Sequence, residues 1–235
     1  MGRITQKVGT KGSQMWLQLL INRHPTVIEN HLRPVLDLNP EDKILWHSPL
    51  AQDEYSEYRD KEFLKRVSTR LQHRSLASFW PNGGPVWDGL GTTSRDDVIL
   101  VEAKSHISEL ASKCQAREPA KAQIQKSLKH AAEFYGAAPH ADWLNGYYQY
   151  ANRLAHLYLM RHLNGIPAWL CFVYFVNDSE MSGPKSVAEW RSAIATAHSH
   201  LGLGEHSLTP FIVDLFIDVA ELTSAVSQSQ CSVGS

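Results

Sequence analysis

The chain has 235 residues, 43% of them hydrophobic, enough to bury the core of one domain with a short extension. Its 23 basic and 24 acidic residues leave a net charge of −1, which argues against a general nucleic-acid binder but not against an enzyme with a local basic groove. Three widely spaced cysteines, Cys114, Cys171 and Cys231, indicate neither a disulfide framework nor a cysteine zinc site. A reduced cytoplasmic protein is expected, with no membrane partner, because no signal-like segment or apolar run of membrane length is present.

Residues 1–42 are expected to form a tail and a helical extension. Residues 1–12 are polar and contain glycine, which predicts a loose tail. Ser13 is the expected N-cap of a helix over residues 14–23, which ends before Pro25, and a second helix is expected over residues 26–36. This helical pair is expected to pack on the main domain, residues 43–222, or to bind a partner.

A short strand over residues 43–47 and a charged helix over residues 53–71 are expected next. The helix would carry an apolar stripe of Phe63, Leu64, Val67 and Leu71. At 100° per residue, Glu57 and Asp60 fall on or beside that stripe. The same segment carries a basic strip that is either a solvated face or a surface for phosphate contact. Its members are Arg59, Lys61, Lys65, Arg66, Arg70 and Arg74.

One sheet with helices on both faces is predicted for the rest of the domain. Strands are expected over residues 76–80, 86–90, 97–104, 168–176 and 211–219, and helices over residues 120–135, 143–163 and 186–201. Turn-forming residues after the second strand predict an antiparallel hairpin with the third. Residues 98–101 are apolar on both faces, so the third strand should lie inside the sheet. The fold class is therefore α/β, and a flexible tail is expected over residues 223–235.

An acid and a base follow the apolar part of that third strand. Glu102 and Lys104 share one face, because side chains two residues apart in a strand point the same way. The expected hairpin brings Asp88 beside Glu102. Two carboxylates with a lysine suit a hard divalent cation, with the lysine orienting a water. The pattern therefore predicts a Mg²⁺ or Mn²⁺ site with Asp88 and Glu102 as ligands.

Asp88 followed by Glu102-Ala103-Lys104 resembles the signature of the PD-(D/E)XK nuclease superfamily, Asp-(spacer)-Glu-x-Lys on adjacent strands. The resemblance covers roughly residues 53–177. It implies a restriction-endonuclease-like mixed sheet and a metal-dependent nuclease acting on DNA or RNA. It also implies that the main-chain carbonyl of Ala103 helps to bind the metal and that Lys104 positions the attacking water.

The sequence departs from the signature at one point, because Trp87 precedes the aspartate and the nearest proline is Pro85. In the family that it resembles, a helix before the sheet often adds an acid, for which Glu57 is the first candidate and Asp60 the second. A solvated acid at the helix boundary is the alternative. A polar residue from the helix after the Glu-x-Lys strand often approaches the site, and Gln149 fits that role.

Asn152 and Arg153, on the same stripe of that helix, are candidates for phosphate contact. Two alternatives to a nuclease stay open. In one, Glu102 and Lys104 form an ion pair on an ordinary strand, with Asp88 in a turn. In the other, a nuclease-like domain has become an inactive binding or assembly module, which the near-neutral charge favours. Nucleic acid is the expected substrate, and a homodimer is possible.

Overall fold

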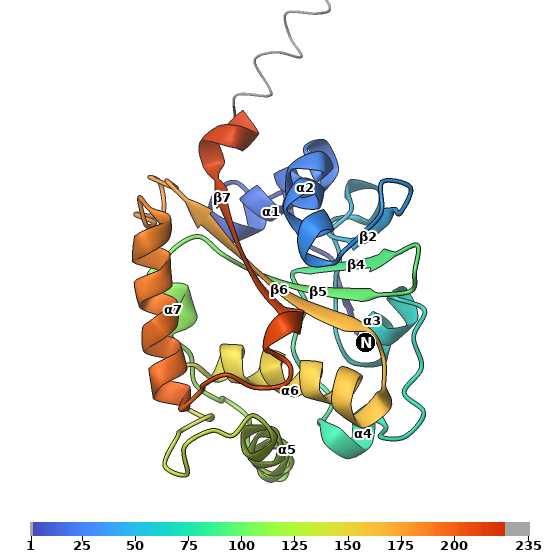
Figure 1. Cartoon of the computed structure of the whole chain (residues 1–235), viewed down its shortest axis with the longest axis vertical. Helices are drawn as coiled ribbons and strands as arrows, with labels where there is room; N and C mark the ends of the chain where they lie inside the picture. Colours follow the sequence, from blue (N-terminus) through green and yellow to red (C-terminus); the bar gives the residue numbers. More distant parts are fainter. Residues whose placement is uncertain (1, 224–235) are drawn as a thin grey trace, which may run out of the picture.

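The structure is a computed structural model that describes residues 2–223. Its fold is built around β5 (Val98–Lys104), the middle strand of a five-stranded mixed sheet. The strand order is β2-β4-β5-β6-β7 (Figure 1). β2 (Ile44–Ser48), β4 (Gly89–Thr93) and β5 pair antiparallel, whereas β6 (Ala168–Val176) and β7 (Ile212–Asp218) run parallel to β5. All seven residues of β5 are buried, which confirms the predicted interior strand.

Helices cover both faces of the sheet, as predicted (Figure 1). On one face, α1 (Gly12–Arg23) and α2 (Pro25–Val35) pack against the side of β5 that carries Ile99, Val101 and Ala103. The opposite face, which carries Val98 and Leu100, is covered by three further helices. They are α5 (Ala120–Phe134), α6 (Tyr148–Asn164) and α7 (Val187–Leu201). The apolar alternation of β5 thus divides the core into two layers.

The prediction of a strand over residues 76–80 is wrong, because this segment forms the short helix α4 (Leu76–Phe79). The Ser75 hydroxyl accepts a bond from the backbone of Ser78 and caps the helix. The outer position in the sheet is instead taken by β2, which had been predicted as a strand but not as a member of this sheet. The second strand is shifted, so that β4 begins at Gly89 and Asp88 immediately precedes it.

The helix predicted over residues 53–71 is also wrong. The segment contains a 3-10 turn (Ala51–Asp53), the short strand β3 (Glu57–Tyr58) and helix α3 (Asp60–Arg66). Glu54 and Tyr55 take left-handed backbone conformations, with φ of 52° and 49°, which interrupts the helical path.

The tail predicted over residues 1–12 is ordered by this same segment. Arg3–Ile4 forms β1, which pairs antiparallel with β3. The Arg3 side chain donates to the Asp53 carboxylate at 2.9 Å, and the Gln6 backbone donates to the Glu54 carbonyl at 3.1 Å. These pairings join residues about 50 positions apart, which helical periodicity within the segment does not encode.

Two helices begin two or more residues away from their predicted starts. Lys11 is the N-cap residue of α1, so Ser13 is not the cap, and its hydroxyl donates to Glu109 at 2.9 Å instead. α6 begins five residues late, because the Asp142 carboxylate accepts bonds from the backbones of Leu144 and Asn145 and holds that stretch in a turn.

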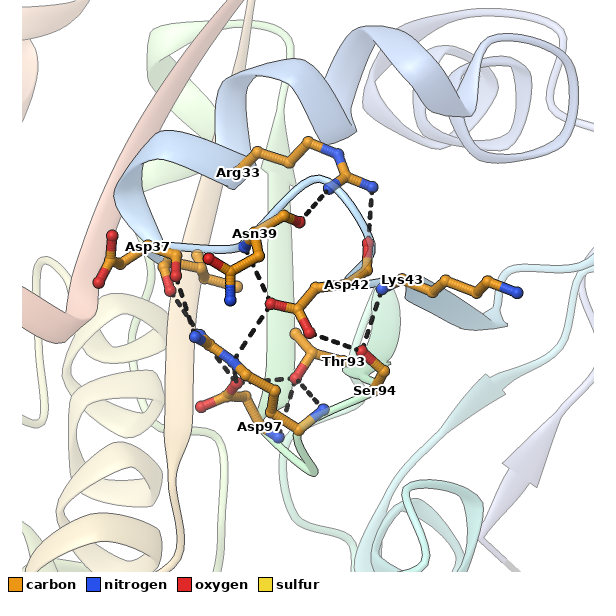
Figure 2. Close-up of polar contacts among 10 residues, drawn as sticks. Arg33, Asp37, Asn39, Asp42, Lys43, Thr93, Ser94 and Asp97 are labelled. Carbon is orange, nitrogen blue, oxygen red and sulfur yellow. Dashed lines mark hydrogen bonds and ion pairs between the residues drawn. The ribbon is translucent and has the colours of Figure 1, made fainter.

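A polar network fastens the helical extension to the turn between β4 and β5 (Figure 2). The Asp42 carboxylate accepts a bond from the Asn39 backbone at 2.9 Å and from the Ser94 hydroxyl at 3.1 Å. Arg95 donates to the main-chain carbonyl of Leu36 at 2.7 Å. The loop after α2 is therefore tied directly to the central hairpin.

Within residues 2–223, no helix combines the length and apolar character needed to cross a membrane. Cys114 and Cys171 are free thiols. Cys231 lies outside the described residues, as does the flexible tail predicted over residues 223–235 except for its first residue.

Candidate functional site

The predicted acid–acid–base set lies where β4 begins and β5 ends. The register pairs Gly89 with Val101, which puts Asp88, one residue earlier, beside the end of β5. The Ala103 backbone N–H donates to the Asp88 carboxylate at 2.8 Å. Glu102 and Lys104 follow on the same strand. The antiparallel hairpin therefore brings together residues that are 14 or more positions apart in sequence.

Glu102 is the most deeply buried acid of this group, with only 1% of its surface exposed. One of its oxygens pairs with the Lys104 ammonium, and the other accepts a bond from Arg153 Nε at 2.6 Å. Lys104 also donates to the side-chain oxygen of Gln149 at 3.0 Å. Both oxygens of Glu102 are thus engaged by cations, as a buried carboxylate requires.

Arg153 is 2% exposed, and protein groups occupy its donors. It donates to the main-chain carbonyl of Val86 at 2.6 Å and to the Asn152 side chain at 3.0 Å. Its guanidinium lies 4.7 Å from the centre of the Trp87 ring. Arg153 and Asn152 are therefore inside the protein, which corrects the expectation that this stripe of α6 reaches phosphate.

Glu57 lies beside Asp88, although it comes from β3 and not from the predicted helix. Both carboxylates and Ala103 line a cavity of about 40 Å³, whose other wall is the N-terminal half of α1. The Gln6 side-chain amide donates to Glu57 at 2.8 Å. Glu57 thus lies next to Asp88, as predicted, but a strand positions it and not the predicted helix.

Asp60, the second candidate for the helix acid, is used elsewhere. Its carboxylate accepts bonds from the backbone N–H groups of Gly83 and Gly84 at 3.0 and 2.9 Å. These bonds hold the turn before β4, so Asp60 serves the loop and does not line the cavity of Glu57 and Asp88.

The acids are divided between two small cavities. Asp88 and Glu57 face the cavity beside α1, whereas Glu102 and Lys104, with Gln149, line a separate space of about 10 Å³ on the α6 side. The proximity of the two groups is evident in their electrostatics, because the charge of Glu102 adds to burial in raising the pKa of Asp88. That Asp88 and Glu102 share one cation stays a prediction.

The charges of the site are unevenly compensated. Burial, with the neighbouring Asp88, raises the pKa of Glu57 to about 8, and burial, with Glu102, raises the pKa of Asp88 to about 7. Burial alone would raise the pKa of Glu102 as well, but Arg153 and Lys104 hold it below its ordinary value. Burial alone would lower the pKa of Lys104, but Glu102 and Asp88 raise it above its ordinary value. The two cations therefore stabilise the negative charge of Glu102, whereas the charges of Glu57 and Asp88 are not fully compensated.

Two glutamines near the site have no sequence signal of function. Gln6 contacts Glu57, as described above. Gln18, on α1, is 5% exposed and accepts a bond from the Gly9 backbone at 2.8 Å while donating to the Lys7 carbonyl at 3.0 Å. Gln18 thereby holds the N-terminal segment beside the cavity.

No group of three or more His, Cys, Asp or Glu side chains within residues 2–223 is arranged to hold a metal ion. No family model matches the chain, and comparisons with curated proteins and with solved structures also give no match. Geometry and electrostatics are therefore the basis for any functional proposal.

Proposed function

We propose that the protein is a divalent-cation-dependent phosphodiesterase that cleaves nucleic acid, a nuclease of the PD-(D/E)XK type with a restriction-endonuclease-like core. The observation that carries the proposal is the pair of adjacent carboxylates, Glu57 and Asp88. They face one cavity at the end of the central strand, with pKa values raised to about 8 and about 7. Perturbed acids of this kind cluster at functional sites.

The chemistry of the donor set fits Mg²⁺ or Mn²⁺. Carboxylate and main-chain carbonyl oxygens are the ligands that these cations prefer. The Ala103 N–H faces Asp88, and in an extended strand the carbonyl of the same residue faces the same side. Glu102 already has both oxygens engaged. Asp88 and Glu57 are therefore the principal ligands, with Ala103 assisting and Glu102 contributing negative charge.

The roles of the remaining residues follow from their protonation and contacts. A bound cation would polarise a phosphate oxygen and lower the pKa of a coordinated water. Lys104, whose pKa is raised, stays an ammonium and serves as a donor that positions water and stabilises charge on phosphate. Asp88, whose pKa burial and the charge of Glu102 raise to about 7 without metal, would have to release its proton before it could hold the cation. Arg153 and Gln149 are positioning residues, because they hold Glu102 and Lys104.

The second candidate is a nuclease-like domain that binds or assembles without cleaving. Its support is the engagement of Glu102, whose oxygens are paired with Arg153 and Lys104 and not turned toward the cavity of Asp88. A network of this kind is also what a purely structural ion pair would form.

A Mn²⁺ titration followed by thermal melting separates these possibilities. A ligand that binds only the native state stabilises it by about 2.7 kcal/mol at 100 times its Kd. We expect Mn²⁺ to raise the melting temperature of the natural protein and to have no effect on Asp88→Asn. The matched control is Asp96→Asn, an exposed acid in the β4–β5 turn whose left-handed backbone, with φ of 64°, asparagine also adopts.

Retention of the Mn²⁺ response in Asp96→Asn and its loss in Asp88→Asn would support the cation site. Absence of any response in the natural protein would exclude that site and the nuclease mechanism with it. A site-specific response without cleavage, across single- and double-stranded DNA and RNA, would favour the binding module.

A further inference from the structure

A second cavity, of about 300 Å³, lies between β7, α6, α7 and the loop before β7. Its walls include Tyr150, His198, Leu203, Glu205, His206 and Asp214. None of the acids of the proposed nuclease site lines it. Its volume is at the low end of the range for pockets that bind small molecules.

Two buried polar atoms in this cavity have no hydrogen-bond partner among the described residues. They are Oδ1 of Asp214 and Nδ1 of His206. Tyr150, by contrast, has its hydroxyl hydrogen-bonded to His198 Nε2 at 2.7 Å. Buried polar atoms without partners are rare in folded proteins, and each one calls for a ligand, an ordered water or a functional role. Two such atoms in one cavity are available to a bound ligand.

The charge of the cavity selects the kind of guest. Asp214 makes no ion pair within residues 2–223. Burial raises its pKa to about 6 although the charge of Arg191 acts to lower it, so the carboxylate is still ionised at neutral pH. Neither Arg191 nor any other Lys or Arg lines the cavity. Burial lowers the pKa of both His198 and His206, so neither supplies a positive charge at that pH. Glu205 adds a second acid at the wall. An anion is therefore repelled, and a cation with N–H donors is favoured.

We propose that this cavity binds a small organic cation, an amine or guanidinium compound, with its N–H groups donating to Asp214. The apolar side chains of Leu154, Leu203 and Ile212 would contact its hydrocarbon part. This inference does not depend on the nuclease proposal.

Isothermal titration calorimetry with agmatine, putrescine and histamine as probes tests the assignment. We expect at least one probe to bind the natural protein and to bind Asp214→Asn about tenfold or more weakly, since a charge-assisted hydrogen bond is lost. The matched control is Asp218→Asn, on the same strand and the same face but outside the cavity, which should bind as the natural protein does. The neutral analogue 1,4-butanediol should give no binding.

Stability gives an independent readout. Asp214→Asn should melt at the same or a higher temperature than the natural protein without ligand, because it removes a carboxylate whose charged form burial destabilises. Leu203→Trp, which fills the cavity from its loop and leaves Asp214 unchanged, should abolish probe binding.

Four results would overturn the proposal. Three concern binding: the absence of binding by all three amines at millimolar concentration, equal probe affinity in Asp214→Asn, and Zn²⁺ binding that depends on Asp214 while the amines do not bind. A marked loss of stability in Asp214→Asn would also overturn it, because the carboxylate would then be a structural group.

Discussion

Replacement of Lys104 by methionine separates its role from that of Arg153. Lys104 is 6% exposed and contacts Glu102 and Gln149. In Lys104→Met, Glu102 keeps Arg153 as a partner. We therefore expect the lost bonds to Glu102 and to the half-buried Gln149 to cost about 1.5–3 kcal/mol, most of it from the bond to the charged Glu102. Arg153→Met removes the bond to Glu102, the bond to the Val86 carbonyl and the contact with Trp87. That change breaks a buried ion pair, and we expect it to destabilise by about 3–5 kcal/mol.

Thermal melting without metal measures this difference. In a chain of this size, 1 kcal/mol corresponds to about 2–4 °C, so Lys104→Met should lower the melting temperature by roughly 3–12 °C and Arg153→Met by roughly 6–20 °C. Lys129→Met, an exposed lysine on α5, is the control and should change stability by less than about 0.5 kcal/mol. With Mn²⁺ present, Lys104→Met should keep or strengthen its response, because a cation beside the acids is removed.

The reasoning would be refuted by either of two results. A loss of stability in Lys104→Met as large as that in Arg153→Met would mean that both cations are equally structural. If Lys104→Met is folded but loses the Mn²⁺ response, Lys104 is needed to hold the acids in a cation-binding arrangement. Abolished cleavage with an intact Mn²⁺ response is the pattern that assigns Lys104 to chemistry.

Three further predictions concern the acids and the hairpin. The rise in melting temperature with Mn²⁺ should be larger at about pH 8.5 than at about pH 6. Glu57 and Asp88, with pKa values of about 8 and about 7, must release protons to bind Mn²⁺. A response independent of pH would contradict this expectation. Without metal, stability should change with pH in the opposite direction. The native state keeps the protons of Glu57 and Asp88 at a pH where the unfolded chain has lost them, so the free energy of unfolding should fall between about pH 4 and about pH 8. Asp88→Asn should make that fall smaller in melts across the range. Arg95→Ala should lower stability by about 1 kcal/mol through the lost bond to the Leu36 carbonyl, measured by urea unfolding, and should leave the Mn²⁺ response unchanged.

The elements that the sequence predicted well are those whose pattern is local. The apolar runs of β5, β6 and β7 indicate buried strands wherever they pair, and all three are found within a residue or two of the predicted bounds. The shared face of Glu102 and Lys104 follows from the two-residue period of a strand and needs no tertiary knowledge. The position of Asp88 required only that a hairpin form.

The errors lie where distant residues decide the local structure. The segment around Glu57 has a helical apolar stripe, but pairing with β1 makes it a strand, and no feature within the segment encodes that partner. Residues 76–80 form an apolar run too short to distinguish a strand from a helix, and the Ser75 cap decides it. The engagement of Arg153 by Glu102 also escaped prediction, because the stripe on α6 fixes a face of the helix but not what that face meets.

The balance of charge explains why this strand end differs from an ordinary buried ion pair. Glu102, Asp88 and Glu57 would carry three negative charges if all were ionised, whereas Arg153 and Lys104 supply two positive charges. The two cations satisfy Glu102, whose pKa is lowered, and the deficit falls on the other two acids, whose pKa values are raised. A structural network has no reason to retain an unpaired acid, because a buried uncompensated charge is destabilising. Under the proposed function, a proton at low pH and a cation at higher pH would neutralise the excess negative charge. The imbalance that weakens the metal-free protein would then also make the site attract a metal.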